Sequence, residues 1–142
     1  MSVHYLEEDR KATGFNRTVT RKWLNEVIKL EGKKPGVISY IFCSDEFLAD
    51  INIRFLKRDY YTDVISFDYT ENDVVSGDIM ISVDRVKENA LNVGVTYIEE
   101  LKRIMVHGLL HLIGYDDTTK ELKAIMSSRE DLYLGMAWEE VK

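Results

Sequence analysis

The spacing of apolar residues changes several times along the chain, and each change predicts a different secondary-structure element. Short runs rich in β-branched and aromatic residues predict strands, whereas apolar residues three or four positions apart predict helices with one buried face. The expected strands are residues 2–7, 37–43, 64–69 and 77–83. The expected helices run from Thr18 or Thr20 to about Leu30, from Glu46 to about Leu56, from Asp84 to Val93, from Thr96 to Gly114, and from Thr118 to Leu134.

Polar residues, glycine and proline predict where these elements begin and end. Thr18 or Thr20 is expected to cap the first helix, because a Thr side chain can accept a hydrogen bond from a free backbone N–H of the first turn. Thr96, followed three residues later by Glu99, has the spacing of a capping box. Residues 32–36 hold the only proline of the chain between two glycines, so we expect a loop there.

Interleaved strands and helices predict an α/β or α+β domain. The strands are too few for a nucleotide-binding doubly wound sheet, and the sequence lacks both G-x-G-x-x-G and G-x-x-x-x-G-K-[ST]. We therefore expect an α+β fold, in which a small mixed sheet of about four strands packs with about five helices. No internal repeat, low-complexity segment or Pro/Gly-rich linker interrupts the pattern, so a single domain is expected over residues 1–142.

The composition is that of a soluble globular protein, with 45% hydrophobic and 31% charged residues. No apolar run reaches the roughly 18 residues that would span a membrane, and residues 1–5 do not resemble the start of a signal peptide. The single cysteine, Cys43, excludes an internal disulfide and fits a reducing compartment. We therefore expect a cytoplasmic protein without a membrane partner.

The net charge of −6 argues at first against a polyanionic partner such as a nucleic acid. The charge is unevenly distributed, however, because residues 1–58 carry a balance of +3 and residues 59–142 one of −9. The basic half leaves room for a local anion-binding face, although an ordinary solvated surface would explain it equally well.

The stretch from Ile104 to Asp117 contains the most specific chemistry of the chain. His107 and His111 are four residues apart, so on a helix they lie on one face and one turn apart. Gly114 can end the helix and turn the chain back, which would bring the carboxylate of Asp117 to the same point. Two nitrogens and one oxygen are three protein ligands of a catalytic zinc site, with the fourth position left for water.

The surroundings of the two histidines favour this interpretation over two ordinary core histidines. All other residues between Ile104 and Ile113 are apolar or glycine, so the segment is expected to be buried on all sides. A buried polar group without a partner costs about 1–3 kcal/mol, and two such groups on one face therefore need an explanation. Hydrogen bonds to backbone carbonyls or acids are the alternative to metal binding.

Zinc suits two imidazoles and a carboxylate most readily, although nickel, cobalt or iron(II) would also accept these ligands. Gly108 occupies the position of the proton-accepting Glu in the peptidase motif H-E-x-x-H, which argues against a protease. We expect Gly108 instead to open space beside the metal for a bulky substrate. Asp116 is the alternative to Asp117 as the third ligand. If Asp117 is the ligand, Asp116 is expected to accept a hydrogen bond from the N–H of one metal-binding imidazole.

Residues His107 to Asp117, read as H-G-L-L-H-L-I-G-Y-D-D, resemble the motif H-G-x-L-H-L-x-G-Y-D-H of the YbeY family of bacterial endoribonucleases. Residues 51–52 and 62–67 resemble its L-N and T-D-V-L-S-F blocks, and residues 77–79 resemble its G-D-I. Met126 and Glu130 match the M-x-x-x-E of its last helix. The resemblance covers roughly residues 45–135 in the right order.

This resemblance implies a metal-dependent, single-strand-specific endoribonuclease that acts through zinc-activated water. It implies a role in maturation of the 16S rRNA of the small ribosomal subunit and in ribosome quality control. The implied partners are single-stranded RNA and the small subunit or its assembly factors, and the implied cofactor is one zinc ion. The alternatives are a ribosome-assembly RNA-binding protein with structural zinc, and a metal hydrolase of another substrate.

The chain departs from the family pattern at two positions, Asp117 in place of the third His and Leu56 in place of an Arg. The first keeps a metal ligand but adds negative charge, and the second removes a cation. The expected metal ligands are thus His107, His111 and Asp117. Substrate contacts are expected from Arg54, Lys57, Arg58 and Ser66, and the candidates for catalytic groups are Arg54, Arg58 and Asp116.

Overall fold

The computed structural model describes residues 2–57 and 62–136. Arg58, one of the predicted substrate-binding residues, lies outside these ranges. The elements follow in the order β1 (Ser2–Glu7), α1 (Arg17–Leu30), β2 (Lys34–Cys43), α2 (Asp45–Leu56), β3 (Val64–Asp68), β4 (Val74–Ser82), α3 (Val83–Val93), α4 (Tyr97–Ile113) and α5 (Lys120–Leu134).

The strands form one mixed sheet in the order β1-β2-β4-β3. Strands β1, β2 and β4 are parallel, whereas β3 pairs antiparallel with β4 through a short turn. The described residues thus form a four-stranded mixed sheet and five helices, and the predicted α+β fold is confirmed.

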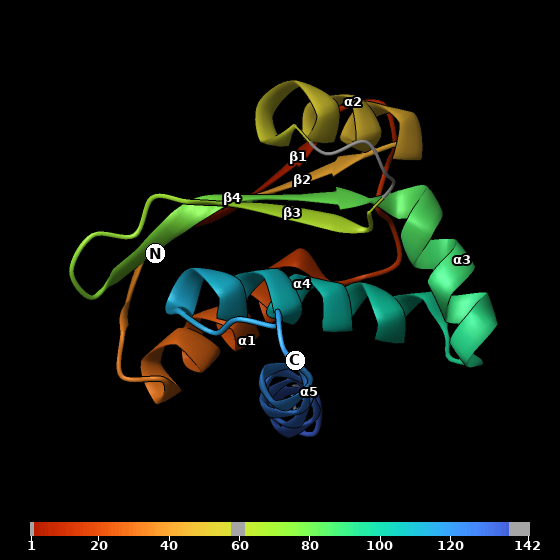
Figure 1. Ribbon diagram of the computed structural model, residues 1–142. Coiled ribbons are helices and arrows are strands. Elements are labelled where there is room, and N and C mark those ends of the chain that lie inside the picture. The colour runs from red at the N-terminus through yellow and green to blue at the C-terminus, as the bar shows by residue number, and fades with distance from the viewer. Residues whose placement is uncertain (1, 58–61, 137–142) are drawn as a thin grey trace.

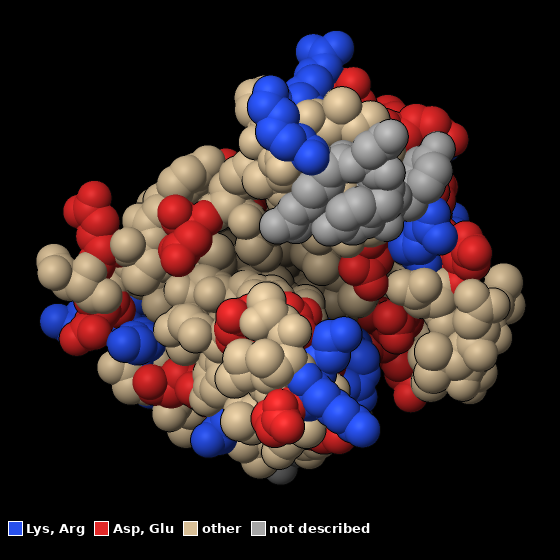
Figure 2. All heavy atoms as spheres, viewed as in Figure 1, with Lys and Arg blue, Asp and Glu red and all other residues tan. Residues whose placement is uncertain are grey.

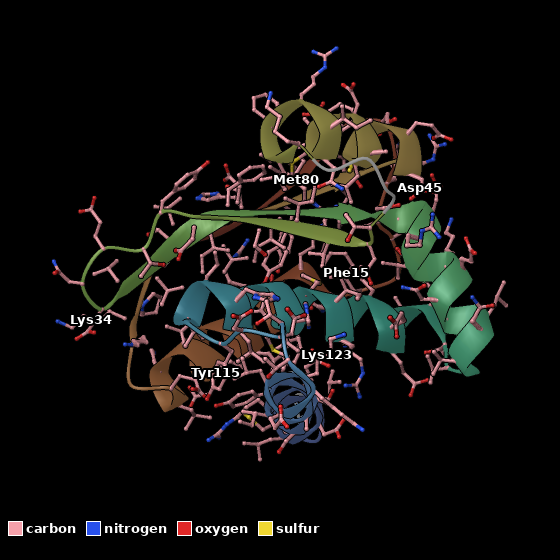
Figure 3. All side chains as sticks on the ribbon, in the orientation of Figure 1. Phe15, Lys34, Asp45, Met80, Tyr115 and Lys123 are labelled. Atoms are coloured by element: carbon pink, nitrogen blue, oxygen red, sulfur yellow. The ribbon has the colours of Figure 1, made fainter. Side chains whose placement is uncertain are left out.

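Helices cover both faces of the sheet (Figure 1). Helix α2 lies on one face, α1 and α4 lie on the other, and α5 packs on the side of α4 that faces away from the sheet. The larger hydrophobic core fills the space between the sheet, α1 and α4, and a smaller cluster around Leu48 and Met80 lies beneath α2. Figure 3 shows Met80 on the α2 side of the sheet and Phe15 on the opposite side. None of the helices in the described ranges has the length and apolar character needed to cross a lipid bilayer.

Helix α4 begins and ends at the predicted signals. The Thr96 hydroxyl accepts the N–H of Glu99 at 3.1 Å, and the Glu99 carboxylate accepts the N–H of Thr96 at 3.0 Å, which together form a capping box. Gly114 ends the helix with a φ of 126°, a conformation that residues with a Cβ rarely adopt. Most of the apolar side chains between these ends are buried, so the helix is held by packing on both its sheet side and its α5 side.

The predicted cap of the first helix and the predicted start of the last helix are wrong. Asn16, not Thr18 or Thr20, caps α1 by accepting the N–H of Val19 at 2.9 Å, and the Thr20 hydroxyl instead donates to the Asn16 carbonyl. Thr119, not Thr118, caps α5 by accepting the N–H of Leu122. In both cases several neighbouring residues can cap a helix, and packing rather than propensity decides between them.

The predicted loop over residues 32–36 and the predicted start of the fourth strand also need correction. Strand β2 begins at Lys34, where its N–H donates to the Asp73 carbonyl at 2.8 Å, and β4 correspondingly begins at Val74. The pairing tolerates Pro35 because the register shifts between Pro35 and Ile38. At its other end β4 stops at Ser82, which caps α3 through the N–H of Arg85.

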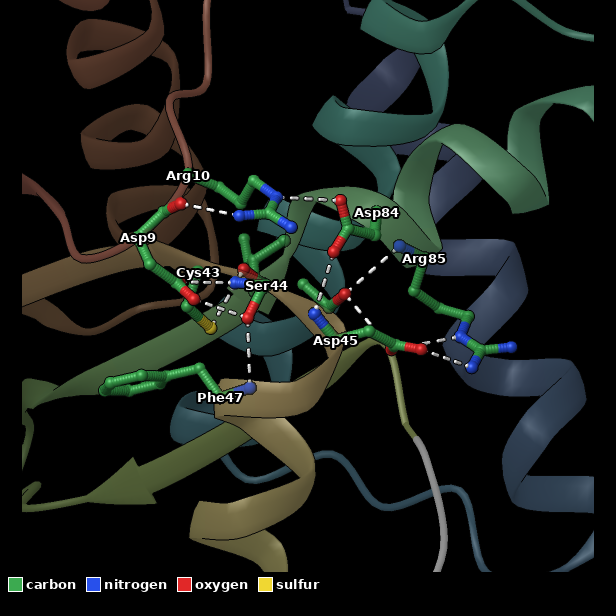
Figure 4. Close-up of polar contacts among 10 residues, drawn as sticks. Asp9, Arg10, Cys43, Ser44, Asp45, Phe47, Asp84 and Arg85 are labelled. Atoms are coloured by element: carbon green, nitrogen blue, oxygen red, sulfur yellow. Dashed lines mark hydrogen bonds and ion pairs between the residues drawn. The ribbon is translucent and has the colours of Figure 1, made fainter.

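The starts of α2 and α3 are joined by a network of polar contacts (Figure 4). The Asp9 carboxylate accepts both the N–H and the hydroxyl of Ser44, at 2.7 and 2.6 Å, and the hydroxyl bond holds the pKa of Asp9 below its usual value. Asp84 accepts the N–H of Asp45 at 3.0 Å, and Asp45 pairs with Arg85 at 2.8 Å. The network fixes the ends of β2 and β4, from which α2 and α3 depart.

Candidate metal centre

Helix α4 places His107 and His111 one turn apart in its C-terminal half. Their Nε2 atoms are 3.2 Å apart, and both side chains are only partly buried. The predicted burial of residues 104–113 therefore holds for the apolar residues other than Ile113, but not for the two imidazoles, which face a cleft.

The turn after α4 brings Asp117 to the same point. Gly114 and Tyr115 both donate their N–H groups to the Leu110 carbonyl, at 3.1 and 3.0 Å, and this reverses the chain. The Oδ2 atom of Asp117 then lies 3.5 Å from Nε2 of His107 and 3.6 Å from Nε2 of His111.

These three atoms have the spacing that a tetrahedral metal ion requires. Ligand atoms bound at about 2.0–2.1 Å in tetrahedral geometry lie about 3.3 Å from one another. The three distances of 3.2, 3.5 and 3.6 Å are close to this value. Among the described His, Cys, Asp and Glu residues, this is the group of three or more whose ligand atoms lie together, all within 4.8 Å. The arrangement could therefore hold one ion and leave its fourth position open.

Glu130 of α5 fixes the orientation of His107. Its carboxylate oxygen Oε2 lies 2.5 Å from Nδ1 of His107, and its other oxygen pairs with Nη1 of Arg103 at 2.9 Å. An Nδ1 proton held by a carboxylate leaves Nε2 unprotonated and aimed at the metal position, as is usual for metal-binding histidines. The M-x-x-x-E match in the last helix singles out Glu130 in the sequence, but it does not predict the contact with His107.

The site is electrostatically suited to a cation. Burial alone would lower the pKa of His107, but the hydrogen bond to Glu130 and the negative charges of Glu130, Asp117 and Asp63 raise it. Burial raises the pKa of the neighbouring Asp63, whose carboxylate accepts a hydrogen bond from Asn89 at 3.1 Å. The shift at His107 reflects the carboxylates around its imidazole, whereas the shift at Asp63 reflects burial.

The three groups open into a cleft of about 840 Å³. The surface is hollowed between α2 and the layer of α4 and α5 (Figure 2). The cleft is lined by the end of α2, the strand β3 and the residues before it, the C-terminal half of α4, the following turn and α5: Leu56, residues 62–66, Asp68, His107, His111, Leu112, residues 116–118 and Lys123.

The chain matches the family model described as Endoribonuclease YbeY over residues 4–137. The chain belongs to the endoribonuclease YbeY family. It is 42% identical to Endoribonuclease YbeY of Parabacteroides distasonis over 142 residues, which cover all of both chains. It is 46% identical to Endoribonuclease YbeY of Flavobacterium johnsoniae over 85% of this chain and 87% of that one.

A solved structure also resembles this chain over most of its length. The solution structure of a protein from Thermotoga maritima has 28% sequence identity and a TM-score of 0.68, and the match covers 97% of this chain and 90% of that chain. The predicted family, the α+β fold and the enzyme class, a hydrolytic endoribonuclease, are confirmed.

Some of the predicted substrate-binding residues line the cleft, whereas others of those described lie outside it. Ser66 lines the cleft, and its hydroxyl donates to the Gly108 carbonyl at 3.4 Å. Leu56, the apolar residue at the end of α2, also lines it. Arg54 and Lys57 lie on the exposed side of α2 and at its end, outside the lining, and Arg54 pairs with Asp50 at 3.1 Å.

Two expectations about the surroundings of the metal are wrong. Gly108 does not open space for a substrate, because a Cβ there would lie 2.6 Å from Cγ2 of Ile79 and 3.3 Å from the hydroxyl of Ser66. Its small size is needed where α4 packs against the sheet. Asp116 does not hold the imidazole of His107 either. Its carboxylate accepts the N–H of Asp117 and the hydroxyl of Thr118 within the turn, and Glu130 takes the imidazole instead.

Proposed function

We propose that this chain is a cytoplasmic, zinc-dependent endoribonuclease that hydrolyses single-stranded RNA in maturation of 16S rRNA and in ribosome quality control. The observation that carries the metal-dependent part is the convergence of His107 Nε2, His111 Nε2 and Asp117 Oδ2 at an open cleft. The RNA substrate is supported by membership of the YbeY family. A single free thiol, the buried Cys43, fits a reducing compartment.

The spacing of the ligand atoms favours zinc over metals that prefer six ligands. Octahedral coordination at about 2.1 Å brings neighbouring ligand atoms to about 3.0 Å, whereas tetrahedral coordination separates them by about 3.3 Å. The distances of 3.2 to 3.6 Å match the tetrahedral case better. Zinc bound there would lower the pKa of a bound water towards 7 and so supply a nucleophile for phosphodiester hydrolysis.

Different residues of the chain bind the metal, orient its ligands and contact the RNA. His107, His111 and Asp117 hold the metal, and Glu130 keeps His107 in the tautomer that binds it. Ser66 contacts the RNA within the cleft, Arg54 and Lys57 contact its phosphates beyond the edge of the cleft, and Arg58 is a further phosphate contact. Asp116, which lines the cleft, stays a candidate for a group that moves a proton, and Arg58 stays a candidate for stabilising the phosphate. Arg54 lies outside the cleft lining and would act on the reacting phosphate only if its side chain left Asp50.

Metal content and RNA cleavage test the proposal together. Purified protein is expected to contain one zinc ion per chain and to cut single-stranded RNA, with both properties lost on chelation. His111→Ala and Asp117→Ala should lose zinc and activity, whereas His4→Ala, which changes an exposed histidine of β1, should keep both. Full zinc occupancy in Asp117→Ala would contradict the ligand assignment, and undiminished cleavage by His111→Ala would contradict the metal-dependent mechanism.

The ribosomal role has a separate test in cells. A strain that lacks this gene should accumulate precursors of 16S rRNA, and wild-type protein but not His111→Ala should restore their processing. Copurification of the wild-type protein with small-subunit components would support the proposed partners, which are the small subunit or its assembly factors. Rescue by His111→Ala would favour a ribosome-assembly RNA-binding protein whose role does not depend on metal-dependent cleavage.

A further inference from the structure

The described carboxylates give the cleft a negative charge that an RNA-binding site must offset. Asp63, Asp68, Asp116 and Asp117 all line it, and a single bound divalent ion offsets only part of their charge. A phosphate group that entered this cleft would therefore be repelled unless a cation of the protein faced it. The substrate proposed above makes such a cation necessary.

Lys123 is the one lysine or arginine among the described residues that line the cleft. It lies in the second turn of α5 and is drawn between α5 and α4 in Figure 3. It lines the same cavity as His107, His111 and Asp117, although it comes from a different helix. Its position is therefore set by the packing of α5 against α4, which also brings Glu130 to His107.

The charge of Lys123 is available to a ligand. Its side chain is exposed, and it forms no ion pair with any described carboxylate. The cations nearby differ in this respect, because Arg103 is paired with both Glu130 and Asp131, at 2.9 and 2.8 Å. A lysine that lines an acidic cleft without an acidic partner at ion-pair distance is placed to bind an anion.

We propose that Lys123 binds a phosphate of the single-stranded RNA held in the cleft, as its ammonium group pairs with a phosphate next to the metal position. This inference rests on the proposed function. From the sequence, the phosphate-binding cation was expected near the end of the second predicted helix, at Arg54, Lys57 or Arg58. The proposed cation, Lys123, belongs to α5 instead. The apolar Leu56 occupies the α2 wall of the cleft, and Lys123 provides the charge from the α5 wall.

Equilibrium binding of a short single-stranded RNA at increasing salt concentration tests the phosphate contact. Lys123→Gln should weaken binding about threefold to tenfold and reduce the slope of log K against log[salt] by about 0.7, the value for one phosphate contact on a single strand. Lys123→Glu should weaken binding further, and Lys123→Arg should preserve it. Lys120→Gln is the matched control, because Lys120 is an exposed lysine one turn earlier on the same helix and outside the cleft lining.

A second-site variant distinguishes a phosphate contact from a structural role. Leu56 and Lys123 line the same cleft, so Leu56→Arg in the Lys123→Gln background should recover part of the lost binding and cleavage. Thermal unfolding and zinc content of the single Lys123 variants should remain those of the wild type, because the Lys123 side chain is exposed.

The outcomes separate this inference from the proposed function. If the wild type contains no zinc or does not cut RNA, the proposed function fails. If the wild type cuts RNA but Lys123→Gln binds and cuts with the same affinity and salt slope, Lys123 is not the phosphate ligand. An equal loss in Lys120→Gln would also overturn the inference, because it would show a general effect of charge.

Discussion

At the scale of single residues, the contact that matters most for the metal site is the one between His107 and Glu130. The Glu130 carboxylate lies 2.5 Å from Nδ1 of His107, is 7% exposed, and is itself held by Arg103. A buried carboxylate with two cationic or donor partners has a fixed position, so it also fixes the imidazole ring. The direction of Nε2 therefore depends on a residue that does not touch the metal.

Replacement of Glu130 should weaken metal binding without removing a ligand. We expect Glu130→Gln to reduce zinc affinity about tenfold and Glu130→Ala about tenfold to hundredfold, because the imidazole loses its hydrogen-bond acceptor and its fixed tautomer. Competition with a chromophoric chelator measures the affinity. Asp131→Ala is the control, since Asp131 also pairs with Arg103 but is exposed and has no contact with His107. Unchanged affinity in Glu130→Ala would show that the ring is held by the backbone of α4 alone.

The three metal ligands can be predicted from the sequence, whereas the residues that α5 contributes to the site cannot. His107, His111 and Asp117 lie within eleven positions, so helix geometry and one turn suffice to predict that they meet. Glu130 lies 23 residues from His107 in the sequence, and Lys123 also reaches the cleft only because α5 crosses α4 at a particular angle. The angle depends on side-chain packing across both helices, which no local pattern encodes.

At the scale of secondary-structure elements, the position of the site depends on how closely α4 approaches the sheet. A Cβ on Gly108 would lie 2.6 Å from a methyl carbon of Ile79, and a Cβ on Gly77 would lie 2.9 Å from a methyl carbon of Leu112. Two glycines, one on each element, therefore allow the close contact. The spacing of apolar residues predicts both elements and their buried faces. It cannot show that Gly108 of α4 packs against the sheet or that Gly77 of β4 packs against α4.

Substitution of Gly108 by alanine tests this close approach. In an exposed helix Gly→Ala stabilises by about 1 kcal/mol, but here the added methyl should clash with Ile79 and produce a net loss of about 1–3 kcal/mol. Urea denaturation measures the change in the free energy of unfolding. Ala124→Gly, at an exposed position of α5, gives the helix-propensity contribution by itself. A Gly108→Ala protein as stable as the wild type would show that the space predicted from sequence exists after all.

At the scale of the whole molecule, Glu31 connects three segments that are far apart in the sequence. It follows α1 directly, is about nine-tenths buried, and accepts hydrogen bonds from Tyr115 at 2.7 Å and from Tyr133 of α5. Tyr115 lies in the turn that carries Asp117, and Tyr133 lies on the helix that carries Glu130. The Glu31 carboxylate thus binds both the turn that carries Asp117 and the helix that carries Glu130, and it connects them to the core around α1.

Loss of the Glu31 carboxylate should therefore affect both stability and the metal site. Glu31→Ala leaves two partly buried hydroxyl groups without their acceptor. A fully buried group would cost about 1–3 kcal/mol, and for these two we expect about 1–2 kcal/mol each, so the free energy of unfolding should fall by about 2–4 kcal/mol. Glu31→Gln keeps one carbonyl acceptor and should lose less. Zinc affinity should fall in the same order, because the turn that carries Asp117 becomes less fixed. Glu26→Ala, at an exposed acid of α1, should change neither quantity.

The pH dependence of stability provides an independent check on the same network. Burial first, and the Glu31 carboxylate next, raise the pKa of Tyr115 and of Tyr133. Above about pH 10 the unfolded chain releases these two protons before the folded chain does, so the stability of the wild type should fall as the pH rises further. The fall should be shallower in Glu31→Gln, in which the neutral amide no longer opposes ionisation of the phenols. If the two proteins lost stability along parallel curves above pH 10, the carboxylate would not control these tyrosines, and the joint anchoring of Asp117 and Glu130 through Glu31 would be refuted.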